Sequence, residues 1–270
     1  MSPAIKIVNV SKAFTIRHNK ADSLKSKVIG TFYKRYREQR ENLWALKNVT
    51  FEIGTGETFG LIGRNGSGKS TLLKIIAGIY SPSAGEVRLA ANASIGTMIE
   101  LGVGFHWELT GKENIFLGGS IYGLTRKEIE EKYQDIVDFS ELSLFMDTPM
   151  KNYSSGMQAR LGFALAANLD PEILLLDEVL AVGDEGFQQK CMNRIEEFRA
   201  RNKTIVFVSH NADAVRQICN RACLLDNGAV LYIGKSEDAL ERYHALLNGA
   251  TPHAIGNGAV ALMSGTGASE

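Results

Sequence analysis

The residues best suited to chemistry in this 270-residue sequence form a glycine-rich segment that ends in lysine and serine. The segment, GRNGSGKS, satisfies the pattern G-x-x-x-x-G-K-S, follows the apolar stretch FGLIG and opens a helical pattern. In that context the backbone N–H groups point inward at phosphate oxygens, and the helix N-terminus adds positive potential. We therefore predict a nucleotide phosphate site, in which Lys69 reaches the β- and γ-phosphates and the Ser70 hydroxyl binds Mg²⁺. The predicted nucleotide-binding residues of this segment are Gly63, Arg64, Asn65, Gly66, Ser67, Gly68, Lys69, Ser70 and Thr71.

Two further segments end in side chains that fit phosphoryl transfer. The run ILLLDE is typical of a buried strand and ends in Asp177, which would bind Mg²⁺, and Glu178, which would orient and polarise the attacking water. The run TIVFVSH ends in His210, which would bond the γ-phosphate or that water. The predicted catalytic residues are therefore Lys69, Glu178 and His210. The structural alternatives are a chance glycine-rich turn, a strand that merely ends in two acids, and a histidine that serves packing.

The elements that must position these residues alternate along the chain between apolar strands and helical stretches. From Phe59 onward, this alternation predicts a parallel sheet covered by helices, and hence an α/β fold. Residues 105–168 have a mostly helical pattern, with capping-box starts at Thr110 and Thr125. We therefore expect a helical lobe inserted into the sheet domain.

The composition excludes several classes of protein. Lys and Arg together number 30 and balance 30 Asp and Glu, so no overall field attracts nucleic acid and we expect no such partner. The three cysteines are too few and too irregularly spaced for a disulfide framework or a zinc site, which fits a reducing cytosol. No run of about 18 uncharged apolar residues is present, so work at a membrane would need a partner that spans it. We expect one domain over residues 1–247 and a disordered tail over residues 248–270, which are rich in Gly, Ala and Ser.

Residues 18–43 form an unusual basic insert between strands predicted around residues 5–10 and 49–53. Its apolar residues recur every four positions, at Leu24, Val28, Phe32 and Tyr36. This spacing predicts a basic amphipathic helix. Such a helix would either contact a membrane-associated partner or present an ordinary solvated face.

A second helix start suited to phosphate follows in the polar turn YSSGMQ, which leads into the apolar stretch ARLGFALAAN. This turn resembles the signature motif LSGGQ of ABC ATPases, and the order of motifs over residues 4–245 is similar to that family. The resemblance implies a P-loop NTPase core of RecA type, with an antiparallel β-subdomain and an inserted helical subdomain that carries the signature motif. It also implies a head-to-tail homodimer, in which Ser154, Ser155 and Gly156 of each subunit contact the ATP held by the other.

The same resemblance assigns roles to single residues. Phe14 would stack on the adenine, with Trp44 as the second choice because the insert blurs the alignment; the alternative for both is core packing. Asp184 would lie in the D-loop and belong to the nucleotide-binding residues. Glu100 stands where the family has a glutamine in the Q-loop, and its carboxylate would bind nucleotide and Mg²⁺ but cannot donate a hydrogen bond. The signature turn also departs from the family pattern at two positions without losing its N–H donors.

Within the ABC family, four segments resemble the ATPase subunit of Wzm–Wzt type polysaccharide exporters. They are ELGVGFHWELTGKEN from Glu100, YSSGM from Tyr153, DEVLAVGDEGFQQKC from Asp177 and SHN from Ser209. This resemblance implies an ATPase that works with two copies of a polytopic Wzm-type permease and exports lipid-linked polysaccharide, at the cytoplasmic face of the bacterial inner membrane. The segment up to Tyr122 would receive the coupling helix of the permease. The insert residues expected near the permease and the lipid headgroup are Lys25, Lys27, Tyr33, Lys34 and Arg35.

The length of the chain leaves no room for an added carbohydrate-binding domain, so we expect that it does not read the end of the glycan. Two other classes of protein remain open. A soluble ABC ATPase of a multiprotein assembly machine would share the motifs, although such proteins often carry two ATPase halves or long coiled coils. A small-molecule kinase would share the phosphate loop, but it would need an acceptor pocket and no signature turn. A membrane partner distinguishes the exporter from the first class, and transfer of the γ-phosphate to water distinguishes it from the second.

Overall fold

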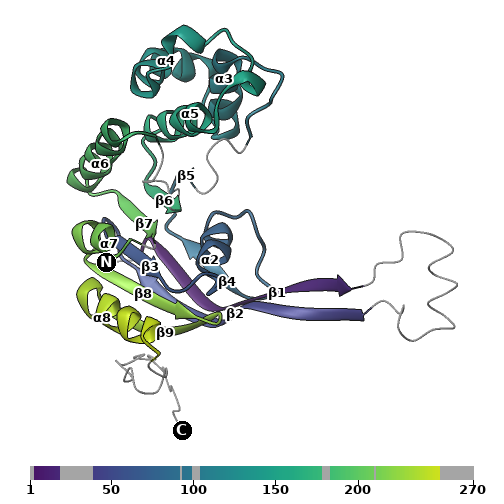
Figure 1. The fold of residues 1–270 in the computed structure, drawn as a ribbon, viewed down its shortest axis with the longest axis vertical. Coiled ribbons are helices and arrows are strands. Elements are labelled where there is room, and N and C mark those ends of the chain that lie inside the picture. The colour runs from purple at the N-terminus through teal and green to yellow at the C-terminus, as the bar shows by residue number, and fades with distance from the viewer. Residues whose placement is uncertain are drawn as a thin grey trace, which may run out of the picture.

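The structure is a computed structural model that describes residues 3–18, 39–91, 93–98, 104–177, 183–209 and 211–249. Its strands form two sheets, and three of its helices form a lobe to one side (Figure 1). The strands are β1 (Ile5–His18), β2 (Gln39–Ile53), β3 (Thr58–Ile62), β4 (Ala84–Leu89), β5 (Ile95–Met98), β6 (Ile173–Asp177), β7 (Thr204–Val208), β8 (Arg221–Asp226) and β9 (Ala229–Lys235). The helices are α2 (Lys69–Ile76), α3 (Gly111–Ile121), α4 (Arg126–Ser140), α5 (Ser155–Ala167), α6 (Glu185–Ala200), α7 (Ala212–Ile218) and α8 (Ser236–Leu247), with 3₁₀ turns at Ser143–Phe145 and Met150–Asn152.

The larger sheet has the strand order β5-β6-β7-β3-β8-β9. Its first five strands run parallel, and only β9 is antiparallel to its neighbour β8. Strands β3 and β7 are buried along their whole length, as uninterrupted apolar runs predict for the centre of a parallel sheet. On one face, α6, α7 and α8 contribute Phe187, Val215 and Leu240 to a core with the sheet. The predicted parallel sheet covered by helices is confirmed.

The smaller sheet has the order β2-β1-β4 and is antiparallel throughout. Helix α2 lies between the two sheets, because its apolar residues contact both. Leu72 and Leu73 share one core with Phe51 of the smaller sheet and Leu61 of the larger sheet. The antiparallel β-subdomain that the family resemblance implies is therefore present, and it packs against α2 on the side away from the larger sheet.

The β1–β2 ribbon corrects the prediction made for residues 18–43. His18 and residues 39–43 lie in paired strands and not in a helix, because the register continues from Ala13 opposite Trp44 to His18 opposite residue 39 and satisfies the backbone groups of both strands. The predicted strands were accordingly too short. Figure 1 shows the ribbon projecting away from the sheets. Residues 19–38, with the apolar repeat and the five residues assigned to the permease and lipid, lie outside the described residues.

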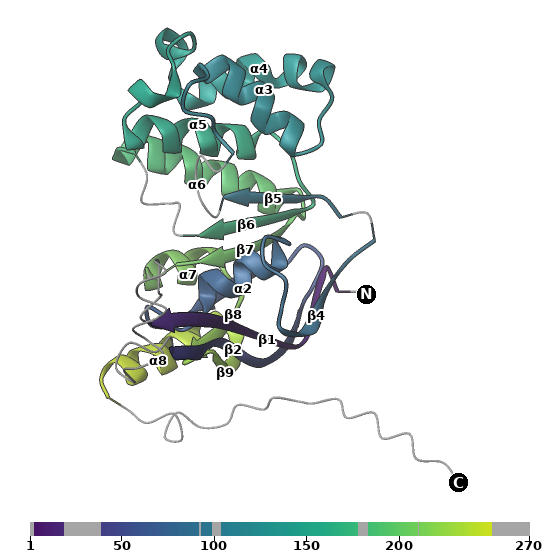
Figure 2. The same cartoon turned by 90° about the vertical axis from the view of Figure 1, so that its right-hand side faces the viewer.

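Helices α3, α4 and α5 form a helical subdomain with its own apolar core, which includes Ile115, Ile129 and Leu161. Both predicted capping boxes are confirmed: the hydroxyls of Thr110 and Thr125 accept from the backbone three residues on, and the glutamates there accept in return. Figures 1 and 2 show the subdomain beyond β5 and β6, with α6 between it and the rest of the sheet.

None of the described helices is both long and apolar enough to cross a membrane. The three cysteines, Cys191, Cys219 and Cys223, are free and buried. Burial raises the pKa of the Cys191 and Cys219 thiols to about 12, so both remain protonated near neutral pH and neither is a nucleophile.

Candidate functional site

The phosphate loop between β3 and α2 has a backbone that depends on glycine. Gly63, Gly66 and Gly68 have φ values of 148°, 79° and 106°, in the region that side chains disfavour. A Cβ atom on Gly63 would lie 2.1 Å from the Leu225 carbonyl oxygen, and one on Gly68 would lie 2.6 Å from the Ala45 carbonyl oxygen. Both glycines are therefore required by backbone conformation and by close approach, as the predicted phosphate loop demands.

The N-terminus of α2 is left open to an anion. Its N-cap is Gly68, and no side chain bonds to the first N–H groups of the helix. Five other helices begin differently, with an oxygen of Thr110, Thr125, Ser154, Asp184 or Asn211 accepting from the first turn. Because uncapped N–H groups and the helix dipole both favour negative charge, the start of α2 is suited to a phosphate.

The ammonium group of Lys69 lies over this loop. The side chain is buried, and Nζ donates to the carbonyl oxygens of Gly63 at 2.8 Å and Arg64 at 3.0 Å. The contacts hold a positive charge inside the curve of the loop. Ser67 is buried against Gly63, and its backbone carbonyl accepts from the N–H of Gly228 at 3.1 Å, so Ser67 supports the loop from behind.

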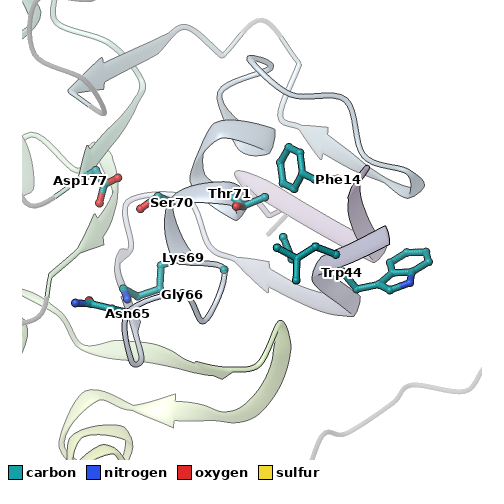
Figure 3. A pocket seen from close by; sticks show the side chains of 11 residues that line it. Phe14, Trp44, Asn65, Gly66, Lys69, Ser70, Thr71 and Asp177 are labelled. Carbon is teal, nitrogen blue, oxygen red and sulfur yellow. The ribbon is translucent and has the colours of Figure 1, made fainter. Parts of the chain in front are cut away.

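A cavity of about 640 Å³ joins the phosphate loop to the β1–β2 ribbon and to the end of β6 (Figure 3). Its lining residues are Phe14, Leu43, Trp44, Ala45, Asn65, Gly66, Gly68, Lys69, Ser70, Thr71 and Asp177. Figure 3 shows Ser70, Lys69 and Asp177 on one side and the aromatic pair Phe14 and Trp44 on the other, with Thr71 between them. This arrangement matches a bound nucleotide, with its phosphates near Ser70 and its base near the aromatic pair. Gly63, Arg64 and Ser67 belong to the same loop but do not line the cavity.

Ser70 and Asp177 provide oxygen atoms on the same wall of the cavity. Asp177 is the last residue of β6 and Ser70 is in the first turn of α2, so both are held by rigid elements. The described residues contain no cluster of three or more His, Cys, Asp or Glu side chains that could hold a metal by themselves. One hydroxyl and one carboxylate suit Mg²⁺, which usually completes its ligands with water and substrate phosphate. The donor set therefore fits a magnesium ion that arrives with the nucleotide.

The two aromatic candidates for adenine both reach the cavity. The ring of Phe14 packs edge-on against Tyr80, with centroids 5.7 Å apart, and the Lys12 ammonium lies over both rings. Trp44 is 48% exposed, which argues against core packing as its role. Leu43 and Ala45 also line the cavity and were missed from the sequence, although their position on either side of Trp44 was a usable signal. Which ring stacks on the base stays a prediction.

Three predicted residues, Glu100, Glu178 and His210, lie outside the described residues. The topology nevertheless relates them, because they follow closely on the ends of β5, β6 and β7, which are neighbouring parallel strands. Carboxyl ends of adjacent parallel strands meet at one edge of a sheet, where ligands bind in α/β folds. Asp177 marks that edge within the cavity.

The signature turn is exposed at the start of α5. Ser154 is the N-cap, and its Oγ accepts from the N–H of Met157 at 3.2 Å. Tyr153 fixes the start of the turn, because its hydroxyl donates to the Phe145 carbonyl at 2.7 Å. Burial raises the pKa of this hydroxyl to about 12. Ser154, Ser155, Gly156 and Asp184 do not line the cavity of their own chain. Their contact with a nucleotide across a dimer stays a prediction.

Comparisons with known proteins agree with these features. A family described as ABC transporter matches residues 46–181. The chain is 42% identical over 243 residues to the O-antigen export system ATP-binding protein RfbB of Klebsiella pneumoniae, over 90% of this chain and 98% of that protein. It is 41% identical over 248 residues to the teichoic acids export ATP-binding protein TagH of Shouchella clausii, over 92% of this chain and 67% of that protein.

Among solved structures, the fold is similar to that of a dimeric ATP-binding cassette in a post-hydrolysis state bound to ADP and Pi. The TM-score is 0.67 and the identity 25%, over 86% of this chain and 98% of that chain. The predicted P-loop α/β fold is confirmed by this likeness. The chain therefore belongs to the ABC transporter family, and the predicted resemblance to the ATP-binding subunits of polysaccharide export systems is confirmed.

Proposed function

We propose that the chain is the ATPase subunit of an ABC exporter that moves a lipid-linked polysaccharide across the bacterial inner membrane, acting at its cytoplasmic face. The observation that carries the ATPase activity is the open start of α2, with Lys69, Ser70 and Asp177 on one cavity. Export of a surface polymer is supported by the similarity to proteins named for export of O-antigen and of teichoic acids.

Binding of ATP follows from the charges of the loop. The N–H groups at the start of α2 receive the β- and γ-phosphates, and Lys69 exchanges its bonds to the Gly63 and Arg64 carbonyls for charge-assisted bonds to phosphate oxygens. Ser70, Asp177 and Glu100 would hold Mg²⁺, which neutralises phosphate charge and orients the γ-phosphate. The adenine lies at the aromatic end of the cavity, on Phe14 or Trp44.

Hydrolysis requires one water molecule on the far side of the γ-phosphorus. A bond forms between the water oxygen and that phosphorus while the bond to the β–γ bridging oxygen breaks, which yields ADP and phosphate. Glu178 orients the water and accepts its proton, and His210 bonds the γ-phosphate. Lys69 and the helix start stabilise the negative charge that moves onto the β-phosphate.

A second copy of the chain completes each site. The signature turn is exposed and lies in a different lobe from the phosphate loop, so one ATP molecule is gripped by the loop of one subunit and the turn of the other. Solved ATP-binding cassettes with this fold form dimers, which supports the arrangement. Because ATP binds the dimer better than the monomer, nucleotide favours association and hydrolysis allows the subunits to part.

The permease would dock on the helical subdomain, where the loop before α3 holds an exposed tryptophan rigidly. Trp107 is 58% exposed, whereas Asn114, which bonds to the loop residues on either side of it, is fully buried. The Asn114 amide accepts from the His106 N–H at 2.6 Å and donates to the carbonyls of His106, Leu109 and Thr110 at 3.1, 3.0 and 2.9 Å. A large aromatic side chain on a fixed loop is the kind of residue that anchors a protein interface.

The loop is also tied to the segment before the signature turn. The N–H of Lys151 donates to the Trp107 carbonyl at 2.9 Å, and its ammonium pairs with Glu108 at 2.7 Å. A second cavity, of about 800 Å³, opens on the same subdomain. Its lining residues are Thr110, Lys112, Glu113, Phe116, Arg126, Glu130, Tyr133 and Asp147. A permease segment seated here would therefore be linked through one loop to the signature turn.

We expect Trp107→Ala to weaken association with the permease by about 30-fold or more in Kd, the scale of an interface anchor. ATP hydrolysis by the isolated chain should stay within about twofold of the wild type, because Trp107 does not line the nucleotide cavity. The measurement is co-purification from detergent-solubilised membranes, followed by titration. Leu247→Ala is the matched control, since Leu247 is 49% exposed on α8, at the other end of the molecule (Figure 1). If both variants retained the permease equally, Trp107 would not be part of the interface.

Deletion of the gene tests the proposed function itself. In the deletion strain, undecorated lipid-linked glycan should accumulate inside the cell, and the wild-type chain but not a Lys69→Ala chain should restore the surface polymer. Identification of the lipid-linked glycan by mass spectrometry also names the substrate. If the chain belonged to a soluble assembly machine, no lipid-linked glycan would accumulate and soluble partners would co-purify. If it were a kinase, γ-labelled ATP would give a labelled acceptor and no free phosphate.

A further inference from the structure

Helices α4, α5 and α6 meet at a junction of three aromatic rings. Phe139 of α4 stacks on Phe163 of α5 with centroids 5.6 Å apart, and Phe187 of α6 packs edge-on against both rings at 5.9 and 6.1 Å. Phe163 and Phe187 are fully buried, and both belong to the core beneath the larger sheet. The junction therefore joins the helical subdomain to the sheet domain.

Arg160 covers this junction from the second turn of α5. Its guanidinium lies 4.8 Å from the centroid of the Phe187 ring, and its side chain is only 17% exposed. Nη1 donates to Glu141 at 3.1 Å, and Nη2 donates to Asp184 at 2.6 Å. One planar group thus bonds the residue that ends α4 and the residue that begins α6. Only arginine can do this, because a lysine ammonium lacks the fork and stacks poorly on a ring.

The Glu141 arm of the junction is fixed in its own right. Glu141 is the C-cap of α4 with φ at 60°, a left-handed conformation that few non-glycine residues adopt. Its second oxygen pairs with Lys190 of α6 at 3.2 Å, and the same ammonium donates to the carbonyl of Phe139 at 2.9 Å. Arg160 is therefore held on one side by a carboxylate that cannot move far.

The Asp184 arm reaches the loop that follows Asp177. Asp184 is the N-cap of α6, and its Oδ1 accepts from the N–H of Phe187 at 2.9 Å while Oδ2 accepts from Arg160. Its pKa is lowered by the bond from the Phe187 N–H and by the charge of Arg160, so the carboxylate is ionised near neutral pH. Both of its oxygens are engaged by groups of its own chain.

We propose that Arg160 is a positioning residue for ATP hydrolysis: it fixes Asp184, and with it the downstream end of the loop that starts at Asp177, to the helix that carries the signature turn. The proposal rests on the proposed ATPase function. Arg160 lies five to six residues after Ser154 and Ser155, on the same rigid helix. A displacement of the signature turn is therefore passed through the guanidinium to Asp184. The signature turn and the start of α6 are therefore held together by Arg160.

Conservative substitutions can distinguish a positioning role of Arg160 from a contribution to the stability of the fold. Asp184→Asn keeps an oxygen that caps α6, because asparagine is as good an N-cap as aspartate, but it loses the ionic bond to Arg160. Arg160→Gln removes the fork, and Arg160→Lys keeps the charge without the fork. We expect Asp184→Asn and Arg160→Gln each to lower kcat about fivefold to tenfold with KM for ATP within about twofold, and Arg160→Lys to recover only part of the loss. The double variant Arg160→Gln/Asp184→Asn should be no slower than the slower single variant.

The measurements are steady-state ATPase kinetics and thermal melting of the purified full chain. Arg199→Gln is the matched control: the Nη1 of Arg199 donates to both carboxylate oxygens of Glu196, at 2.7 and 2.9 Å, within α6, and loss of this ion pair should leave kcat unchanged. A wild-type chain without ATPase activity would contradict the proposed function. If the wild type is active, unchanged kcat in the variants would overturn the positioning role. Losses of kcat that add up in the double variant would also overturn it. Losses of kcat that follow the melting temperature in all three Arg160 and Asp184 variants would do the same.

Discussion

Replacement of Lys69 by alanine should lower kcat for ATP hydrolysis by about 100-fold or more, the scale seen when one preorganised donor to a developing anion is removed. Lys69 brings a buried positive charge to within 3.0 Å of two loop carbonyls, where the phosphates would otherwise meet only N–H groups. The substitution removes that charge and leaves both carbonyls without a donor, so ATP binding should weaken as well. Phosphate release and fluorescent-nucleotide titration measure the two effects separately.

Lys74→Ala is the matched control on the same helix. Lys74 lies in the last turn of α2, and its ammonium lies over the Tyr80 ring at 5.6 Å, away from the phosphate end. Its removal should change kcat by less than about twofold, as for most surface charges. An equal loss in both variants would show that α2 had been destabilised, and activity above a tenth of the wild type in Lys69→Ala would remove the lysine from the reaction.

The sheet at the centre of the molecule could be predicted from the sequence because its signal is local. Strands β3, β6 and β7 are each five residues long and mostly apolar, and all of their residues are buried except Asp177 at the end of β6. The β1–β2 ribbon beyond Val10 carries no such signal. Its residues Thr15 and Ile16 are exposed, so no buried face imposes an alternation, and the residues with which they pair, 42 and 41, lie 27 and 25 positions further along the chain. The strand predicted from the sequence therefore ended at Val10, where the buried apolar face of β1 ends.

The site shows the same division between local and distant information. The phosphate loop and Asp177 can be predicted from the sequence pattern, because the residues that set the backbone conformation and those that bind phosphate are adjacent in the sequence. Leu43 and Ala45 enter the cavity only because β2 pairs with β1. The bonds of Arg160 join residues 19 and 24 positions apart, and no spacing rule for a helix or a strand selects such partners. Sequence patterns thus find groups that bind phosphate, and the fold is needed to find the residues that position them.

Replacement of Glu178 by glutamine should lower kcat by about 100-fold to 10,000-fold while ATP still binds. Glutamine keeps the size of the side chain but accepts no proton from water. Asp177, the phosphate loop and the start of α2 remain, so affinity for Mg-ATP should change little. The bound nucleotide is then a permanent link between two subunits, and a dimer should accumulate in the presence of ATP.

Size-exclusion chromatography with light scattering measures that dimer, with ATP, ADP or no nucleotide. We expect a dimer with ATP alone, because ADP lacks the γ-phosphate that the signature turn of the second subunit would contact. Glu185→Gln is the control, since Glu185 is an exposed carboxylate in the first turn of α6 and should affect neither hydrolysis nor association. A Glu178→Gln chain that binds ATP and stays monomeric would rule out a nucleotide shared between subunits. Normal hydrolysis by that chain would instead assign the water-activating role to another group, and His210 would be the next residue to replace.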